Sequence, residues 1–287
     1  MRRISHSVAM AGASWRVLQS DRELFAIPVM CLVSTSATAL LGGGAIYFSL
    51  DRSVVGADGT TGMAATPFTY VVGAVAYLLI TFVVTFFTAA LVAGARERLM
   101  GGRPTLGSAF TMASTRLPEI VLWSLLTGTV GLVLNLVRNR AGIFGQIAAR
   151  LAGTTWEVVT WLAVPVIVAE GTGPIASLRR SAGLFRHTWG ENLVGQIGFG
   201  IIGVLAVVPG IVIAGLLMAT LPAIGLVVGV LWVVATWVVV TAMSGIFRTV
   251  LYQYAAGAPI PDEFRDTDLA AVFQTRSTRT TLSAVGV

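Results

Sequence analysis

The sequence predicts an all-α, polytopic membrane protein with six transmembrane helices and three amphipathic helices at the cytoplasmic interface. Hydrophobic residues make up 55% of the 287 residues, charged residues make up only 11%, and the mean hydropathy is +0.84. A soluble domain carries about 25% charged residues, so a water-soluble fold is excluded. Long uncharged segments also alternate with clusters of arginine, a pattern that is typical of a helical membrane protein.

Six segments are long enough to cross a bilayer, whose hydrocarbon core needs about 20 residues of α-helix. The fourth is the shortest, and we expect it to gain length from one continuous helix that begins near Ile143. The last two are joined almost directly at Pro222, which predicts a tight antiparallel hairpin. Gly225 and Gly229 have the small-residue spacing of close helix contacts. The predicted spans are 24–50, 68–93, 119–137, 155–169, 193–220 and 223–247.

The positions of the arginines predict the orientation. Every basic residue is Arg and none is Lys, and most lie before the first span, after the sixth, or on two of the even-numbered connections. Because basic residues are retained on the cytoplasmic side, both termini are predicted to be cytoplasmic in a bacterial cell (inner) membrane. The connection 51–67, on the opposite side, is rich in Gly, Thr and Ala and is expected to be a flexible exposed loop.

Apolar residues recur at helical spacing ahead of three spans, which predicts amphipathic helices near 4–19, 105–117 and 174–189. Such helices can lie in the headgroup layer while their arginines reach lipid phosphate. The alternative is that their apolar stripes pack against the ends of the spans. Residues 1–257 then form the membrane domain and 258–287 a flexible cytoplasmic tail. The expected interfacial anchors are Trp15, Arg16, Arg179, Arg180, Arg186 and Trp189.

The segment 156–196 carries a distinctive combination of residues: Trp156, Pro165, Glu170, Gly173, Pro174, Ser181, Trp189, Gly190 and Glu191. With these residues the chain resembles an uncharacterised family of six-span actinobacterial membrane proteins, a domain of unknown function. It is more distantly similar to the membrane domain attached to some glycerophosphodiester phosphodiesterases. The resemblance implies architecture only, and these 287 residues contain no phosphodiesterase domain. From the residues themselves we interpret the signature as structural, with a ligand site as the alternative.

Motifs that carry chemistry are missing from the sequence. Cys31 is the only cysteine, so a disulfide framework or a cysteine metal site is excluded. His6 and His187 fall in interfacial segments, and GxSxG, HExxH and glycine-rich phosphate loops are absent. We therefore expect no enzymatic activity and no cofactor or metal ion.

One polar constellation stands near the outer ends of the third and fourth spans. Gln146, Arg150 and Glu157 would lie on roughly one side of a continuous helix from Ile143 onward, close to Asn135 and Arg138. Ionisable groups near lipid depth are costly and pair or face a cavity. These residues predict an ion pair between Arg150 and Glu157 that closes the outer end of the bundle. The alternative is a functional site, either a polar vestibule or a site for anionic lipid.

The function that these patterns favour is a non-enzymatic lipid- or partner-binding scaffold or accessory subunit. The net charge of +6 does not indicate nucleic acid, because the arginines flank apolar segments where anionic headgroups are nearer. Expected partners are membrane lipids with anionic headgroups and a membrane protein or a second copy of the chain. The alternative function is a transporter or channel for a lipid-like or small solute.

Overall fold

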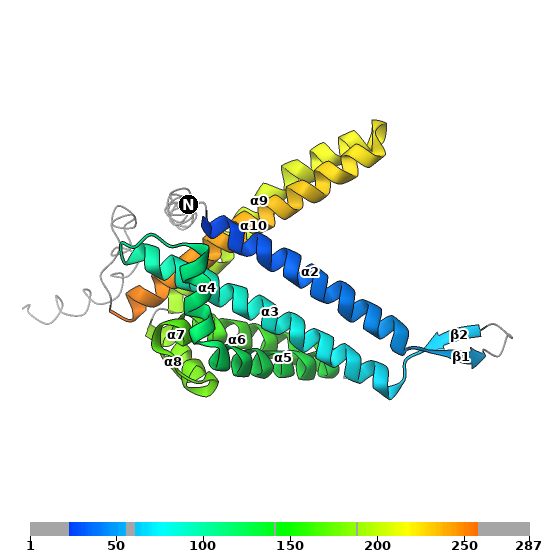
Figure 1. The fold of residues 1–287 in the computed structure, drawn as a ribbon, viewed down its shortest axis with the longest axis horizontal. Helices are drawn as coiled ribbons and strands as arrows, with labels where there is room; N and C mark the ends of the chain where they lie inside the picture. Colours follow the sequence, from blue (N-terminus) through cyan, green and yellow to red (C-terminus); the bar gives the residue numbers. More distant parts are fainter. Residues whose placement is uncertain (1–22, 56–60, 141, 188, 258–287) are drawn as a thin grey trace, which may run out of the picture.

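The computed structural model describes residues 23–55, 61–140, 142–187 and 189–257, and these residues are almost entirely helical (Figure 1). The predicted helix at 4–19 and the predicted tail at 258–287 lie outside them. The elements in chain order are α2 (Glu23–Ser49), β1 (Asp51–Val55), β2 (Thr61–Ala64), α3 (Pro67–Leu99), α4 (Leu106–Thr115), α5 (Leu117–Arg140), α6 (Ile143–Thr160), α7 (Ala163–Glu170), α8 (Pro174–His187), α9 (Trp189–Thr220) and α10 (Pro222–Ala255).

Six helical segments of the described chain are long and apolar enough to cross a membrane, which confirms the predicted number of spans. They are 23–49, 67–99, 117–140, 145–170, 203–220 and 222–255. The protein is therefore a multi-pass membrane protein. Successive spans run in opposite directions, so α3, α7 and α10 end at the same side of the bundle at which α5 begins (Figure 1). We call this side the charged end and the opposite side the far end.

The connection between α2 and α3 differs from the expected flexible loop. Strands β1 and β2 pair as an antiparallel hairpin, in which Val54 lies opposite Gly62 and Val55 opposite Thr61. Two consecutive valines favour an extended, paired backbone despite the neighbouring glycines. The base of the hairpin is closed by the Thr69 hydroxyl, which donates to the Ser49 carbonyl at 2.8 Å.

The fourth span is not the continuous helix that the sequence predicts. It is broken at Trp161 and Leu162, between α6 and α7. Pro165 follows within the next turn, has no N–H for the Trp161 carbonyl, and crowds that carbonyl with its ring. The helix breaks here because the hydrogen bond to the Trp161 carbonyl cannot form. The polar residues predicted to share this helix still do so, because the break comes after all of them and α6 carries them together.

The buried core lies toward the charged end. It joins the start of α2 (Leu24 and Ile27), the second half of α3, Ile120 and Trp123 of α5, most of α7, and the second half of α10. The apolar stripes of α4 and α8 also face this core, through Phe110 and Leu178 among others. For α4 and α8 the structure shows packing against the ends of the spans, although Ile175 at the beginning of α8 is 53% exposed.

The hairpin of α9 and α10 diverges from the other helices toward its tip (Figure 1). Between Pro222 and Trp237, α10 buries only Gly225, whereas from Val238 onward it belongs to the core. The two helices hold each other through Trp232, whose indole Nε1 donates to the Ala206 carbonyl at 2.9 Å. The Trp232 ring lies directly on Gly210, where a Cβ atom would overlap it.

We expect Gly210→Ala to loosen this hairpin, because the added methyl group displaces Trp232 and breaks its hydrogen bond. Losing this hydrogen bond should lower the free energy of unfolding by about 1 kcal/mol. The measurement is the midpoint of thermal unfolding, followed by near-ultraviolet circular dichroism. Gly215→Ala is the matched control, since a Cβ atom at Gly215 in the same helix meets open space. Equal midpoints for the two variants would contradict this role of Gly210.

Candidate functional site

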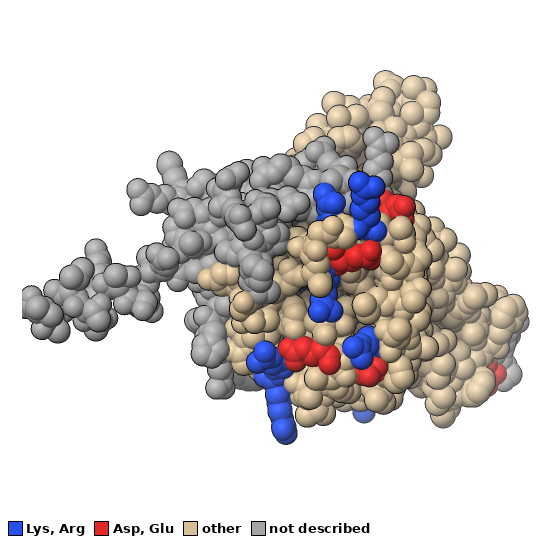
Figure 2. Space-filling model, turned by 60° about the vertical axis from the view of Figure 1, so that its left-hand side comes forward, with Lys and Arg blue, Asp and Glu red and all other residues tan. Residues whose placement is uncertain are grey.

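Charged side chains gather on one face of the molecule, at the charged end (Figure 2). The helix ends place them there: α3 carries arginines in its last turn, α5 carries Glu119 in its first turn, and α7 ends at Glu170. Among the described side chains of this end the arginines outnumber the glutamates. The arginines are Arg96, Arg98, Arg103, Arg116, Arg179, Arg180 and Arg248, and the glutamates are Glu23, Glu97, Glu119 and Glu170.

Two of the glutamates hold the beginning of α4. The Glu23 carboxylate accepts from the backbone N–H of Leu106 at 2.7 Å, and the Glu97 carboxylate accepts from the Ser108 hydroxyl at 2.6 Å. Ser108 and Thr105 also form a capping box, so the backbone N–H groups of Leu106 and Ser108 both have side-chain acceptors. Negative charge at a helix N-terminus is stabilising, because it opposes the positive end of the helix dipole. These carboxylates therefore fix α4 across the ends of α2 and α3.

Glu170 connects its own helix to two others. Its Oε1 accepts from Arg180 Nε of α8 at 3.2 Å and from the Tyr252 hydroxyl of α10 at 3.0 Å. The Arg180 contact is also an ion pair. Because Glu170 is the last residue of α7, this one carboxylate connects α7 to both α8 and α10.

Ser181 of α8 fills the break in the fourth span. Its hydroxyl donates to the Val159 carbonyl at 2.6 Å and accepts from the Leu162 N–H at 3.3 Å. Ser181 is completely buried. One side chain thus satisfies a donor and an acceptor that the broken helix leaves without their usual partners.

Two arginines lie against the same region. The Arg248 guanidinium stacks over the Trp161 ring, with its central carbon 3.6 Å from the ring centroid, a cation–π arrangement. The Arg116 guanidinium packs on Gly171, which ends α7 in the left-handed conformation with φ of 64°. A cation at the C-terminus of a helix is favourable for the helix dipole.

Two arginines of the charged end, Arg103 and Arg179, have exposed side chains. Arg180 is also exposed but is paired with Glu170, while Glu23 and Glu97 accept hydrogen bonds from α4. A guanidinium group binds phosphate oxygens through two parallel N–H bonds. The chemistry that this surface can perform is therefore recognition of phosphate or carboxylate groups.

The predicted polar constellation forms a groove between α5 and α6 at the far end. Four of its five predicted residues line the groove, namely Asn135, Arg138, Arg150 and Glu157, and Gln146 does not. The groove has a volume of about 410 Å³. Arg150 and Glu157 are both described and exposed, and the structure assigns no ion pair between them. Among the described residues, the ion pair is therefore not formed, and four of the five side chains line an open groove instead.

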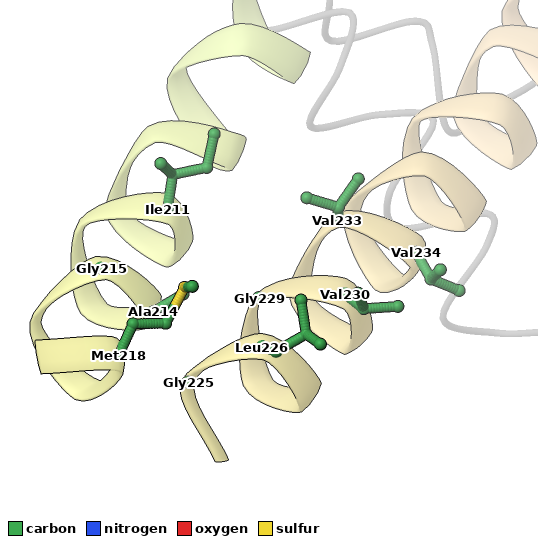
Figure 3. A pocket seen from close by; sticks show the side chains of 10 residues that line it. All are labelled: Ile211, Ala214, Gly215, Met218, Gly225, Leu226, Gly229, Val230, Val233 and Val234. Carbon is green, nitrogen blue, oxygen red and sulfur yellow. The ribbon is translucent and has the colours of Figure 1, made fainter. Parts of the chain in front are cut away.

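A second groove lies between α9 and α10 near the tip of their hairpin (Figure 3). It is apolar, has a volume of about 420 Å³, and is lined by Ile211, Met218, Leu226 and Val233 together with small residues of both helices. Gly225 and Gly229 bring the helices together here, since Cβ atoms at these positions would meet Ala214. The small-residue contact expected from the sequence is thus confirmed.

The predicted interfacial anchors have different outcomes. Arg179 and Arg180 are exposed at the charged end. Arg186 lies in α8 and Trp189 begins α9, but their side chains lie outside the described part of the chain. The predicted anchors Trp15 and Arg16 precede the first described residue.

Several signature residues have structural contacts. Trp156 stacks with Trp123 of α5, with centroids 6.5 Å apart and planes within 11°. Pro165 breaks the fourth span and Ser181 fills the break. Sequence reasoning missed the partners Tyr252 and Arg248, although Arg248 gave one signal: it is the only charged residue of α10.

Comparisons with known proteins give the family and nothing more specific. A search of curated proteins and a search of solved structures found no match to the chain. A family model described as a family of unknown function, DUF6159, matches residues 68–259. The matched segment runs from the beginning of α3 to the end of α10 and is more than half of the chain. This multi-pass membrane protein therefore belongs to the DUF6159 family.

Proposed function

We propose that this protein is a non-enzymatic scaffold or accessory subunit of the bacterial inner membrane, and that its charged end binds anionic lipid headgroups. Both termini then lie in the cytoplasm, as the distribution of arginine indicates. A membrane-protein partner or a second copy of the chain would dock beside the same surface.

The observation that carries this proposal is the division of charge at the charged end. The carboxylates of Glu23, Glu97 and Glu170 are engaged in bonds that join helices, whereas the guanidinium groups of Arg103 and Arg179 are exposed. These bonds fix the positions of the carboxylates without removing their charge, and seven described arginines against four described glutamates leave this end with a net positive charge. Each cationic side chain near an anionic leaflet contributes about 1 kcal/mol of attraction.

The same engagement supports a non-enzymatic role. A carboxylate that acts as a general base needs access to the substrate proton. Glu23 and Glu97 instead hold α4, and Glu170 holds α8 and α10. Substituting these glutamates should therefore disturb the packing of the helices, and we expect no effect on a catalytic step.

The proposal is tested on the full-length protein, extracted in mild detergent, by mass spectrometry of the lipids and proteins that co-purify. We expect Arg103→Gln/Arg179→Gln to retain about fivefold less phosphatidylglycerol, since two cations contribute about 2 kcal/mol at most and salt screens part of it. Arg140→Gln, an exposed arginine at the far end, is the control and should retain nearly the wild-type amount.

A wild-type protein that retains neither anionic lipid nor any partner protein would refute the proposal of a scaffold. So would equal lipid loss in the charged-end variant and in Arg140→Gln. Raising the ionic strength should release lipid from the wild-type protein, because these arginines are exposed to solvent and their charges are screened within about 8 Å at physiological salt.

A second candidate is a transporter for a lipid-like or small apolar solute, which the apolar groove of the α9–α10 hairpin favours. The divergence of this hairpin from the bundle leaves its walls exposed (Figure 1). Reconstituted vesicles that exchange a fluorescent phospholipid between leaflets no faster than protein-free vesicles would exclude this candidate.

A further inference from the structure

The polar groove at the far end lies between two helices and is lined by both small and polar residues. One wall is α5 and the other is α6, and the floor consists of small residues, Gly131, Ala149 and Gly153. These residues let the helices approach each other while leaving a volume of about 410 Å³ between their polar side chains. Leu134 adds an apolar side chain beside the glycine floor.

The length of α5 sets the depth of this groove in a bilayer. Its 24 residues extend about 36 Å at 1.5 Å per residue, more than the hydrocarbon core of about 30 Å. Arg138 lies two residues from the end of α5 and hence at the level of the headgroups. Gly131 lies about 10 Å deeper, at the level of the acyl chains.

Cationic groups reach the groove from both walls at its shallow part. Arg138 on α5 is oriented by Asn135, whose Oδ1 accepts from the guanidinium at 2.9 Å. The same Oδ1 of Asn135 also accepts from the side-chain amide Nδ2 of Asn139 at 3.3 Å. Arg150 faces the groove from α6. Two guanidinium groups on opposite walls suit the oxygens of one phosphate.

Negative charge lies at the deep part. Glu157 is seven residues beyond Arg150 on α6, about 10 Å farther from the far end. A phosphate is repelled from this level and attracted to the level of the arginines. The order of charges therefore matches a lipid whose phosphate is shallow and whose acyl chain is deep.

We propose that this groove binds an anionic phospholipid of the leaflet at the far end, with its phosphate between Arg138 and Arg150 and one acyl chain along Leu134. Asn135 is a positioning residue, because it acts through Arg138. The site is independent of the proposed function, since it lies at the opposite end of the bundle from the charged end.

The test is a titration of the purified full-length protein with palmitoyl-oleoyl phosphatidylglycerol, followed by native mass spectrometry. We expect Arg138→Gln and Arg150→Gln each to weaken binding about tenfold, the effect of losing one charge-assisted bond. Arg140→Gln removes the same charge two residues from Arg138, outside the groove lining, and should change binding less than about twofold. Glu157→Gln should tighten binding, because it removes the repulsive charge.

Further arms identify the ligand and the role of Asn135. Palmitoyl-oleoyl phosphatidylcholine should bind more weakly than phosphatidylglycerol, and inorganic phosphate should not displace the bound lipid. Asn135→Ala should weaken binding in the wild-type background and have no further effect once Arg138 is Gln. Unchanged unfolding midpoints confirm that the variants are folded, as expected for exposed side chains.

Three results overturn the proposal. Equal weakening by Arg140→Gln and Arg138→Gln would show attraction to surface charge in general. Displacement by inorganic phosphate would show a site for a soluble anion. Wild-type affinity in Arg138→Gln and Arg150→Gln would show that phosphatidylglycerol binds elsewhere, and none of these results depends on the arginines of the charged end.

Discussion

Ser181→Ala should lower the midpoint of thermal unfolding by roughly 6 to 12 °C. The substitution leaves the Val159 carbonyl and the Leu162 N–H without the hydroxyl that joins them in a fully buried site. Unsatisfied buried groups cost about 1–3 kcal/mol each, so the two together cost about 3 kcal/mol. Unfolding in detergent can be followed through the thiol of Cys31, which is buried and is the only cysteine of the chain.

The control for this prediction is Ser124→Ala. Ser124 is also buried, at 3% exposure, but its hydroxyl donates to the Val121 carbonyl within the same helix. Removing it leaves no amide unpaired, and we expect a change of less than about 1 kcal/mol. Similar midpoints for the two serine variants would show that the hydroxyl in the break is dispensable.

Gly245→Val should also destabilise the protein, by about 3 kcal/mol. Gly245 of α10 faces Leu91 of α3 in the core, and an added Cβ atom would lie 2.9 Å from the Leu91 Cγ and closer still to one of its methyl groups. Leu91 is only 2% exposed and cannot swing aside without disturbing its neighbours. The helices must separate, and overpacking of this kind costs about 1–3 kcal/mol or more.

Gly44→Val is the matched control, since Gly44 also lies within a spanning helix but a Cβ atom there meets nothing within 4 Å. Both variants add the same atoms to a helix interior, so their difference isolates the contact between α3 and α10. The measurement is again the reactivity of the Cys31 thiol during heating. If Gly44→Val lowers the midpoint as far as Gly245→Val does, the close approach of α10 to α3 is not what the glycine provides.

Much of the far-end site can be predicted from the sequence. Spacing alone places Arg150 and Glu157 on one helix, and α6 does carry both. The predicted continuation of that helix is wrong, because Pro165 acts on the carbonyl four residues before it. Spacing cannot decide between an ion pair and an open vestibule, since that depends on how far α5 lies from α6.

The contacts of the charged end are beyond sequence reasoning. Glu170 and Tyr252 are 82 residues apart, and Glu23 and Leu106 are 83 residues apart. No periodic pattern connects such positions. The amphipathic stripe of α4 is evident in the sequence, yet the same stripe suits a lipid surface or a helix bundle, and only the packing of Phe110 on Phe86 and Phe87 decides between them.

The sequence alone predicts that the protein spans a membrane, how many spans it has and at which end the arginines are concentrated. These properties depend on transferring each segment into hydrocarbon, an energy that is summed residue by residue. Long-range packing was needed to establish which helices touch, where Ser181 enters the fourth span, and that α9 and α10 diverge from the bundle. The physical reason is that lipid tails are as apolar as leucine, so hydrophobicity does not distinguish a lipid neighbour from a helix neighbour. Close contacts at glycine and hydrogen bonds between residues distant in the sequence determine which helices pack together.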